Sequence, residues 1–318
     1  MSLRVAVQMD PIEYINIAGD SSFALMLAAQ ERGHEVFEYH VTSLTLDADD
    51  RLWAEAAPVR VRRVAGDHFE KGEAQRLDLG RDIDVVLMRQ DPPFHMGYIT
   101  ATHMLERIRH ETLVVNDPAN VRNAPEKVMV LDYRRFMPPT LVTRSVEEVR
   151  RFMQEHGAVV VKPIHGNGGK AIFRVPESGD NLTALFEVFN QTWPEPHMVQ
   201  PFLPEVSEGD KRIVLVDGEI AGAINRIPGE GEFRSNLAMG GSAEATQLTP
   251  REREICAAMG PDLKRLGLTF VGIDVIGGKW LTEINVTSPT GIVAISNFDG
   301  TDVAGMIWDA IEKRVSER

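Results

Sequence analysis

The chain has 318 residues, of which 43% are hydrophobic and 25% charged, values that are ordinary for a globular protein with room for two or three domains. Its net charge of −13 argues against binding to nucleic acid or to an anionic membrane, so an anionic ligand would need a local concentration of cationic side chains. No segment approaches the roughly 18 apolar residues of a membrane span, and the N-terminus leads into an apolar strand without a signal-peptide pattern.

The first third of the chain alternates predicted strands and helices. Strands are expected at residues 4–9, 34–39, 83–88 and 112–116, and helices at residues 23–32 and 99–109. Asp20 or Ser21 can cap the first helix, which stops at Gly33. This alternation of strands and helices predicts a parallel sheet covered by helices. Residues 46–78 are polar and weakly periodic, so we expect them to form a surface excursion of irregular strands.

Polar clusters follow three of these strands, at residues 10–22, 89–93 and 116–118. Ligands of parallel sheets bind beyond the carboxyl ends of the strands, so the clusters are candidate ligand sites. Their Pro and Asp residues can equally be ordinary turn residues. Arg89 directly follows a buried strand, where a guanidinium needs an anionic partner, and we therefore expect it to face a ligand.

A domain boundary is expected near residues 118–123. The segment that follows, from Asn123 to Lys127, has the pattern of a capped helix start, with Glu126 three residues after the capping residue.

The middle of the chain contains a glycine-rich turn between two predicted strands. The elements expected here are a strand at residues 140–143, an amphipathic helix at residues 145–156, and strands at residues 158–163 and 171–175. Backbone N–H groups around Gly166, Gly168 and Gly169 can cradle phosphate oxygens, although glycines between two strands often serve the turn alone. No helix follows, so the turn is neither a Walker A loop nor a Rossmann fingerprint. Lys162 favours the phosphate interpretation, because a lysine ending a buried strand is costly to bury without an anion.

The segments that follow include two candidate ligand contacts. Residues 198–203 form an extended segment that can border an adenine, or can equally be an interdomain strand. After a strand at residues 213–216, the glycine-rich residues 228–241 predict a loop that closes over substrate, unless they form only a disordered loop tip. Cys256 is the only cysteine and lies in an apolar helical stretch, so we expect a core thiol in a cytoplasmic protein without internal disulfides.

Residues 270–289 are the most informative stretch and predict a hairpin with its turn at residues 277–279. Side chains alternate between the faces of a strand, so Glu283 and Asn285 share one face, and the turn places Asp274 on the same face. Neighbouring carboxylates repel each other, and a cation bound between them is the simplest way to offset that repulsion. Mg²⁺ suits such oxygen ligands, together with water and phosphate oxygens. The alternative is a solvated acidic face.

Together these features resemble the ATP-grasp superfamily, and several motifs narrow the resemblance to bacterial glutathione synthetases. The motifs are Met9–Ile12, Asp20–Phe23, Met88–Pro93, Gly209–Arg212, Arg226–Pro228, Asn236–Gly241 and Glu283–Thr290. The resemblance extends from about residue 4 to about residue 312 without large gaps. It implies a chain of α/β and α+β class. A parallel-sheet domain at residues 1–122 would precede a two-part ATP-grasp domain, with a central and lid subdomain at residues 123–200 and a C-terminal subdomain carrying the metal hairpin at residues 201–318.

The resemblance also implies the activity. The family joins the cysteine carboxylate of γ-glutamylcysteine to glycine and cleaves ATP to ADP and phosphate, using Mg²⁺, or Mn²⁺ as a second candidate. The expected partners are these small molecules, and the family resemblance suggests a homotetramer. The chemistry needs phosphorylation of a carboxylate, which depends on positioning and charge neutralisation rather than on a nucleophilic side chain.

The site residues are carried over from the family motifs. The nucleotide is expected at Lys127, Lys162, Gly166, Gly168, Gly169, Gln200, Pro201, Phe202, Leu203 and, for the ribose, Asp210. The metal ligands are expected to be Asp274, Glu283 and Asn285. Arg212 and Arg226 would flank the reacting groups, and Asn236 would close over the acceptor. The dipeptide is expected at Asn16, Ser21 and Arg89, and glycine at Ser288, Pro289 and Thr290.

Some residues depart from the family pattern, and two other interpretations stay open. His165, Asn167, Lys170 and Gly291 differ from the residues expected in relatives, which puts lid kinetics and acceptor preference in question. Another ATP-grasp ligase, such as a D-alanine–D-alanine or glutamate-adding enzyme, would share the lysines and metal ligands. A nucleotide-binding protein that kept the fold and lost catalysis would release no ADP with any acid and amine.

Overall fold

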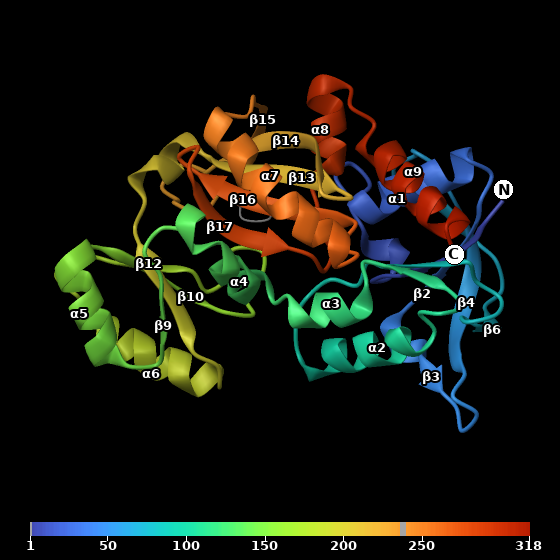
Figure 1. The fold of residues 1–318 in the computed structure, drawn as a ribbon, viewed down its shortest axis with the longest axis horizontal. Coiled ribbons are helices and arrows are strands. Elements are labelled where there is room, and N and C mark those ends of the chain that lie inside the picture. Colours follow the sequence, from blue (N-terminus) through green and yellow to red (C-terminus); the bar gives the residue numbers. More distant parts are fainter. Residues whose placement is uncertain (1, 236–239) are drawn as a thin grey trace.

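The structure, a computed structural model, describes residues 2–235 and 240–318. Its first sheet runs in the order β3-β4-β2-β1-β7-β8, with β5 and β6 paired to β4. Figure 1 labels the strands β2, β3, β4 and β6 of this sheet. The strands are β1 (Arg4–Gln8), β2 (Glu35–Tyr39), β3 (Thr45–Leu46), β4 (Leu52–Val61), β5 (Phe69–Lys71), β6 (Gln75–Asp78), β7 (Val85–Met88) and β8 (Leu113–Val115). Strand β1 pairs in parallel with β2 and β7, and β7 with β8, so the predicted parallel sheet is confirmed.

The helices of this region follow the predicted order. They are η1 (Ile12–Tyr14), α1 (Ser21–Glu31), η2 (Val41–Ser43), α2 (Met96–Arg107) and α3 (Pro118–Asn123). Of the two capping candidates, Asp20 is the N-cap of α1, because its Oδ1 accepts a hydrogen bond from the N–H of Phe23 at 2.6 Å. The polar residues between β1 and α1 thus hold the helix start at the carboxyl edge of the sheet.

The expectation of a surface excursion was wrong for strand β4. This strand pairs antiparallel with β2 and buries Leu52, Ala54 and Ala56 in the main core. Alanines carry little of the hydrophobic signal from which a buried strand is recognised, and charged residues such as Glu55 lie between them on the exposed face. The alternation was therefore weak in the sequence although the strand is a core element.

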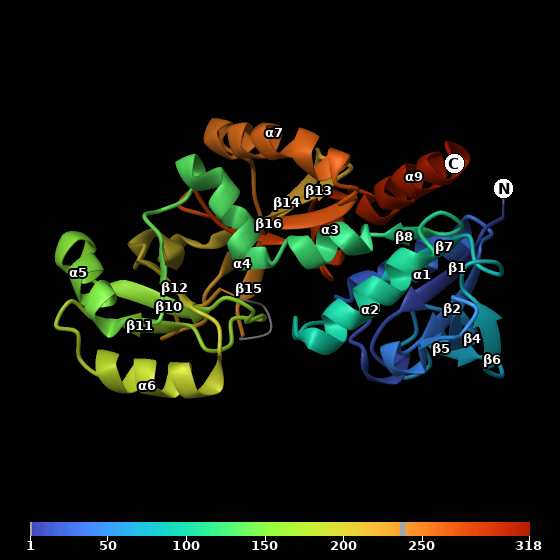
Figure 2. The same ribbon diagram turned by 60° about the horizontal axis from the view of Figure 1, so that its bottom comes forward.

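The second sheet is antiparallel and runs in the order β11-β10-β12-β9. Its elements are β9 (Leu141–Thr143), α5 (Val146–His156), β10 (Val159–Pro163), β11 (Phe173–Val175), α6 (Leu182–Thr192) and β12 (His197–Pro201). Apolar residues of α5 and α6 form a separate core with β10 and β12, including Val149, Phe186 and Phe189. The sheet and its two helices lie at the end of the molecule opposite the first sheet (Figure 2).

The third sheet, in the order β15-β14-β13-β16-β17, lies between the other two (Figure 1). Its strands are β13 (Asp210–Val216), β14 (Glu219–Ile227), β15 (Ser242–Ala245), β16 (Phe270–Ile276) and β17 (Trp280–Asn285). The remaining helices of the described residues are α4 (Glu126–Met129), η3 (Val130–Phe136), η4 (Pro204–Glu208), α7 (Pro250–Arg265), α8 (Ile292–Asp299) and α9 (Val303–Ser316). The predicted hairpin is confirmed as β16 and β17, and Cys256 is buried in α7 as expected.

The predicted cap of the helix at residue 126 was wrong. Pro125 occupies the capping position of α4 without a side-chain hydrogen bond, and Glu126 is the first helical residue. The Glu126 carboxylate instead accepts a hydrogen bond from the hydroxyl of Thr287, far along the chain. A tertiary contact has therefore replaced the local one that the sequence pattern suggested.

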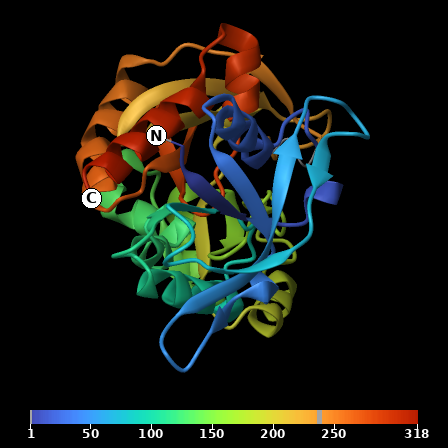
Figure 3. The same cartoon turned by 90° about the vertical axis from the view of Figure 1, so that its right-hand side faces the viewer.

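Helix α9 returns to the beginning of the chain and packs against α1, so that both termini lie near each other (Figure 3). Trp308 of α9 is fully buried, and its indole N–H donates to the carbonyl of Leu25 at 2.8 Å. Arg32 pairs with Asp309 at 2.8 Å and with Glu312 at 3.0 Å. No helix of the described ranges is sufficiently long and apolar to cross a membrane.

Replacing Trp308 by Phe is expected to lower the free energy of unfolding by about 1–3 kcal/mol, because the Leu25 carbonyl loses its donor in a buried setting. Urea titration followed by circular dichroism measures the change. Tyr14→Phe is the control, since Tyr14 is 86% exposed and the substitution should change the stability little. An unchanged midpoint for Trp308→Phe would show that this hydrogen bond does not contribute to the stability of the fold.

Candidate active site

A cavity of about 850 Å³, open to solvent on one side, lies where the second and third sheets face each other. The size is typical of a small-molecule site. Every residue that the family resemblance assigned to the nucleotide lines it: Lys127, Lys162, Gly166, Gly168, Gly169, Gln200, Pro201, Phe202, Leu203 and Asp210. The metal candidates Asp274 and Glu283 line it too. Segments far apart in the sequence thus converge on one cavity.

Two lysines supply positive charge to this cavity. Lys127 on α4 contacts the carbonyl oxygen of Gly166 at 2.5 Å and the carboxylate of Glu283 at 3.2 Å. Lys162 at the end of β10 is 6% exposed and makes no hydrogen bond or ion pair with a described residue. Burial lowers the pKa of Lys162. An anionic group in the cavity would relieve this cost, which is the role that phosphate oxygens fulfil.

The glycine-rich turn has the backbone that its sequence suggests. Gly168 and Gly169 have φ values of +61° and +75°, which side chains with a Cβ rarely adopt. At Gly166 a Cβ would lie 2.7 Å from the Pro163 ring. The turn therefore depends on glycine, and its backbone can approach a ligand closely.

Neighbouring side chains contact the residues that are expected to border the adenine. The side-chain amide of Gln200 donates to the Thr140 hydroxyl at 2.9 Å. The Phe202 ring lies edge-on to Phe233 at 6.2 Å between centroids, and the Arg174 guanidinium lies 3.9 Å from its centroid. An aromatic ring between these groups suits contact with a planar base.

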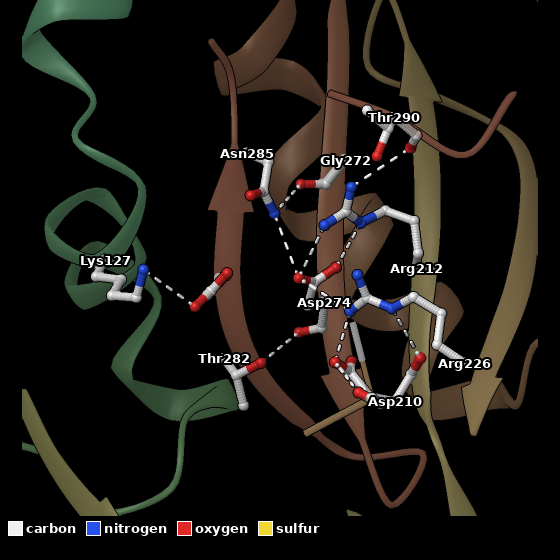
Figure 4. Close-up of polar contacts among 11 residues, drawn as sticks. Lys127, Asp210, Arg212, Arg226, Gly272, Asp274, Thr282, Asn285 and Thr290 are labelled. Atoms are coloured by element: carbon white, nitrogen blue, oxygen red, sulfur yellow. Dashed lines mark hydrogen bonds and ion pairs between the residues drawn. The ribbon is translucent and has the colours of Figure 1, made fainter. Parts of the chain in front are cut away.

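Four charged side chains on three neighbouring strands form a buried network beside the cavity (Figure 4). Arg212 binds both carboxylate oxygens of Asp274, at 2.5 and 3.0 Å. Arg226 contacts Asp274 at 3.1 Å and Asp210 at 2.5 Å. Although burial acts to raise the pKa of Asp274, the two guanidiniums hold it well below its usual value. Asp274 is therefore ionised.

Asp210 has a different environment from Asp274. Burial, with the neighbouring charge of Asp274, raises the pKa of Asp210 to about 6 despite the contact with Arg226. The hydroxyl of Ser235 donates to one of its oxygens at 3.0 Å, and the other oxygen is buried without a hydrogen-bond partner in the described part of the chain. An unpartnered oxygen lining the cavity is available to a ligand hydroxyl or to a cation.

The hairpin residues fit a divalent cation. Asp274 and Glu283 lie opposite each other in register, and the Asn285 side-chain amide lies 3.4 Å from Asp274 (Figure 4). Within residues 2–235 and 240–318, no three His, Cys, Asp or Glu side chains gather closely enough to hold a metal ion. A metal bound here would therefore complete its coordination with the Asn285 amide oxygen, water or phosphate oxygens, as Mg²⁺ commonly does.

Arg89 connects the carboxyl end of β7 to the loop at residues 288–290. Its Nε donates to the Ser22 hydroxyl and its Nη2 to the carbonyl of Pro289, both at 3.0 Å. Ser288 donates to the carboxylate of Asp91. The Thr290 carbonyl accepts a hydrogen bond from Arg212 at 3.3 Å, so this loop connects Arg89 and Asp91 with the buried network of Arg212 and Asp274.

The structure does not bring the other two expected dipeptide contacts onto Arg89. Ser22, the neighbour of Ser21, makes the hydrogen bond, and the Ser21 hydroxyl is buried without a partner in the described residues. Asn16 accepts a hydrogen bond from the N–H of Ala18 at 3.2 Å within its own turn. Asn236, expected to close over the acceptor, lies outside the described residues.

Comparison with known proteins assigns the family. Residues 3–122 match the N-terminal domain of prokaryotic glutathione synthetase, and residues 126–300 match its ATP-grasp domain. The chain belongs to the prokaryotic glutathione synthetase family. It is 57% identical over 314 residues to glutathione synthetase of Rhodopseudomonas palustris, covering 99% of each chain. It is 45% identical to that of Shewanella oneidensis, covering 99% of this chain and 100% of the relative.

Solved structures confirm the ATP-grasp fold of this glutathione synthetase family member. D-cycloserine synthetase DcsG matches with a TM-score of 0.69 at 18% identity, covering 98% of this chain and 99% of that chain. The RimK domain protein ATP-grasp from Sphaerobacter thermophilus matches with a TM-score of 0.65 at 20% identity, covering 96% and 98%. The predicted fold class, an N-terminal parallel-sheet domain followed by an ATP-grasp domain, is thus confirmed.

Several residues of the site were not singled out from the sequence. Phe233 and Arg234 line the cavity, and Arg234 donates to the Gly169 carbonyl at 3.3 Å, so the loop preceding β15 touches the glycine-rich turn. Their only sequence signal was membership of the long loop at residues 228–241. Tyr98 directly precedes the helix predicted at residues 99–109 and belongs to no motif, so the sequence did not single it out, and the structure places it in α2. Its hydroxyl is buried without a partner among the described residues.

Proposed function

We infer that this chain joins γ-glutamylcysteine to glycine, with cleavage of ATP to ADP and phosphate and with Mg²⁺ as the cofactor. The observation that supports this most is the full-length similarity to glutathione synthetases, together with the convergence of the expected nucleotide residues on one cavity. The cavity carries two lysines, and a carboxylate pair lies at its wall.

The geometry explains how a carboxylate can be activated here. The cysteine carboxylate attacks the γ-phosphorus of ATP, its oxygen gains the phosphoryl group, and ADP leaves. Lys127 and Lys162 neutralise the negative charge of the phosphate oxygens, and Arg212 and Arg226 lie beside the expected position of the reacting groups. Mg²⁺ held by Asp274, Glu283 and Asn285 would supply further charge neutralisation at the phosphates.

The second step needs protection from water. Glycine's nitrogen attacks the acyl phosphate, the C–N bond forms and phosphate leaves. Water would compete for the same carbon, so the site must be closed during the reaction. The contact of Arg234 with the Gly169 carbonyl joins two loops over one side of the cavity, which supports their action as a common lid.

Release of ADP by the purified protein tests the function. Mg-ATP, γ-glutamylcysteine and glycine are supplied together and then omitted in turn, with alanine and serine as alternative acceptors. ADP that appears only with both substrates, with glutathione as product, would establish the ligase. ADP release with a different acid and amine, and none with this pair, would keep the ATP-grasp chemistry and overturn the substrate assignment.

The organisation of the chain is part of the proposal. We propose domains at residues 1–122, 123–200 and 201–318, a homotetramer, and a cytoplasmic location. The first sheet falls within the first range and the third sheet within the last, which supports the division. Helix α4 and η3 nevertheless pack against β17, so residues 126–136 are associated with the last range in space. Light scattering of the purified chain tests the tetramer.

Arg89→Lys is expected to raise the KM for γ-glutamylcysteine by about 10- to 100-fold, because a charged multidentate contact is lost. The KM for ATP should stay within about threefold of its original value, since Arg89 is not among the residues that line the nucleotide cavity. Steady-state kinetics with each substrate varied separately measures both constants. Arg81→Lys, at an exposed arginine, is the control. Equal changes for ATP and dipeptide would contradict a specific donor contact.

A further inference from the structure

Glu126 is not among the residues that line the nucleotide cavity, although the next residue, Lys127, is. Glu126 is the first residue of α4, and one of its oxygens accepts a hydrogen bond from the Thr287 hydroxyl at 2.8 Å. No other hydrogen bond or ion pair joins its side chain to the described residues. Burial, with the nearby Glu283 carboxylate, raises the pKa of Glu126, although Lys127 acts in the opposite direction. This carboxylate lacks a cationic partner in contact.

Glu126 directly precedes Lys127, which lines the nucleotide cavity, and contacts Thr287, which directly precedes the loop at residues 288–290. Consecutive residues of a helix project about 100° apart, so Glu126 and Lys127 face different directions. Lys127 faces the cavity through Gly166 and Glu283. Glu126 contacts Thr287, which immediately precedes the loop that Arg89 and Arg212 hold at Pro289 and Thr290.

A second buried polar group faces the same region from the N-terminal domain. Tyr98 of α2 is 1% exposed, and its hydroxyl has no hydrogen-bond partner in the described part of the chain. Burial, with the charges of Glu126 and Asp91, raises the pKa of this phenol, and the charge of Arg89 acts in the opposite direction. A carboxylate without a cation in contact and a hydroxyl without a hydrogen-bond partner are groups that a small polar ligand can satisfy.

Neither a helix-capping role nor membership of an acidic metal-binding cluster explains the carboxylate of Glu126. Glu126 is not a helix cap, because Pro125 occupies that position. Nor is it a third acidic ligand beside Asp274 and Glu283, because no such group of three exists in residues 2–235 and 240–318. A cation supplied by a substrate would compensate the charge of this partly buried carboxylate.

The position of Glu126 indicates which substrate would supply that cation. If ATP and γ-glutamylcysteine react as inferred above, the activated carbonyl lies near Lys127 and Glu283, where the phosphates meet the metal hairpin. The ammonium group of the dipeptide is at its far, glutamyl end. The ammonium group that must come to the activated carbonyl is that of glycine.

We propose that Glu126 binds the ammonium group of glycine and receives its proton as the nitrogen attacks. The proposal rests on the ligation proposed above. In this step two N–H bonds break. One proton passes from the ammonium group to the Glu126 carboxylate, which frees the nitrogen lone pair for attack, and the second leaves with the departing phosphate as the N–C bond forms and the C–O bond to phosphate breaks. The Thr287 hydroxyl fixes one carboxylate oxygen, which leaves the other for the ammonium group.

Two substitutions separate the charge of Glu126 from its hydrogen bond. Glu126→Gln keeps an oxygen acceptor for Thr287 and removes the charge, whereas Thr287→Val removes the hydrogen bond and keeps the charge. Glu126→Gln is expected to lower kcat/KM for glycine by about 100-fold. Thr287→Val should lower it by less than about fivefold. The KM values for ATP and γ-glutamylcysteine should stay within about threefold in both variants.

A second measurement isolates the first chemical step. Positional isotope exchange in ¹⁸O-labelled ATP with γ-glutamylcysteine and no glycine reports formation of the acyl phosphate. Glu126→Gln should keep this exchange within about threefold of the original rate. Melting curves establish that the variants are folded, and Glu126→Ala is carried in parallel under the same criteria in case the glutamine variant is not.

Three outcomes would overturn the assignment. Unchanged kcat/KM for glycine in Glu126→Gln would show that no charge is needed there. A larger loss in Thr287→Val would show that the carboxylate only anchors the loop. Loss of isotope exchange would place Glu126 in phosphoryl transfer. Failure of the unmodified protein to make glutathione is a separate result, because it would overturn the proposed function itself.

Discussion

Glu283→Gln is expected to lower kcat by about 10³-fold while the chain stays folded. Glu283 faces Asp274 across the hairpin and pairs with Lys127 at 3.2 Å, so it joins the expected metal site to a phosphate-binding lysine. Glutamine keeps the shape of the Glu283 side chain and removes the charge that attracts the Lys127 ammonium group and the expected Mg²⁺. The carboxylate repulsion with Asp274 also disappears, and the fold should therefore tolerate the change.

Turnover measured against Mg²⁺ concentration tests this expectation. The apparent Mg²⁺ requirement should rise together with the fall in kcat, and circular dichroism should show an unchanged fold. Glu244→Gln provides the matched control, because Glu244 is an exposed residue on β15 of the same sheet. Normal turnover in Glu283→Gln at ordinary Mg²⁺ would remove Glu283 from the metal site.

Arg226→Ala is expected to lower kcat by about 10²-fold or more, and to weaken ATP binding far less. The guanidinium acts on charge that develops as the phosphoryl group moves, so its effect should appear mainly in the transition state. The structure adds a second consequence. Arg226 lies between the buried carboxylates of Asp210 and Asp274, and its removal leaves them facing each other. The variant should lose about 3–5 kcal/mol of stability.

A double variant separates these two effects of Arg226. Asp210→Asn in the Arg226→Ala background removes one of the repelling carboxylates and should restore part of the stability, measured by urea titration. It should not restore kcat. Calorimetric titration with ATP measures the affinity. A loss confined to ATP affinity, with kcat unchanged, would contradict a role for Arg226 in the chemical step.

The sequence by itself determined the features that depend on local pattern. Alternating strands and helices predicted the parallel sheet. The two-residue period of residues 270–286 predicted that Asp274 and Glu283 share a face, and the structure pairs the two residues directly. The spacing of glycines predicted the backbone of the turn at residues 166–169. These features follow from side-chain alternation and from the conformational freedom of glycine, which act within a few residues.

Only the tertiary structure decided which of these elements meet. The pairing of β13 with β16 sets Arg212 opposite Asp274, although the two residues are far apart in the chain. The same holds for the contact of Glu126 with Thr287, which replaced an expected helix cap, and for Trp308 of α9 packing on α1. Such pairings are decided by competition among many burial and charge-pairing contacts across the whole chain. A local sequence pattern therefore does not identify the distant residues that it will contact.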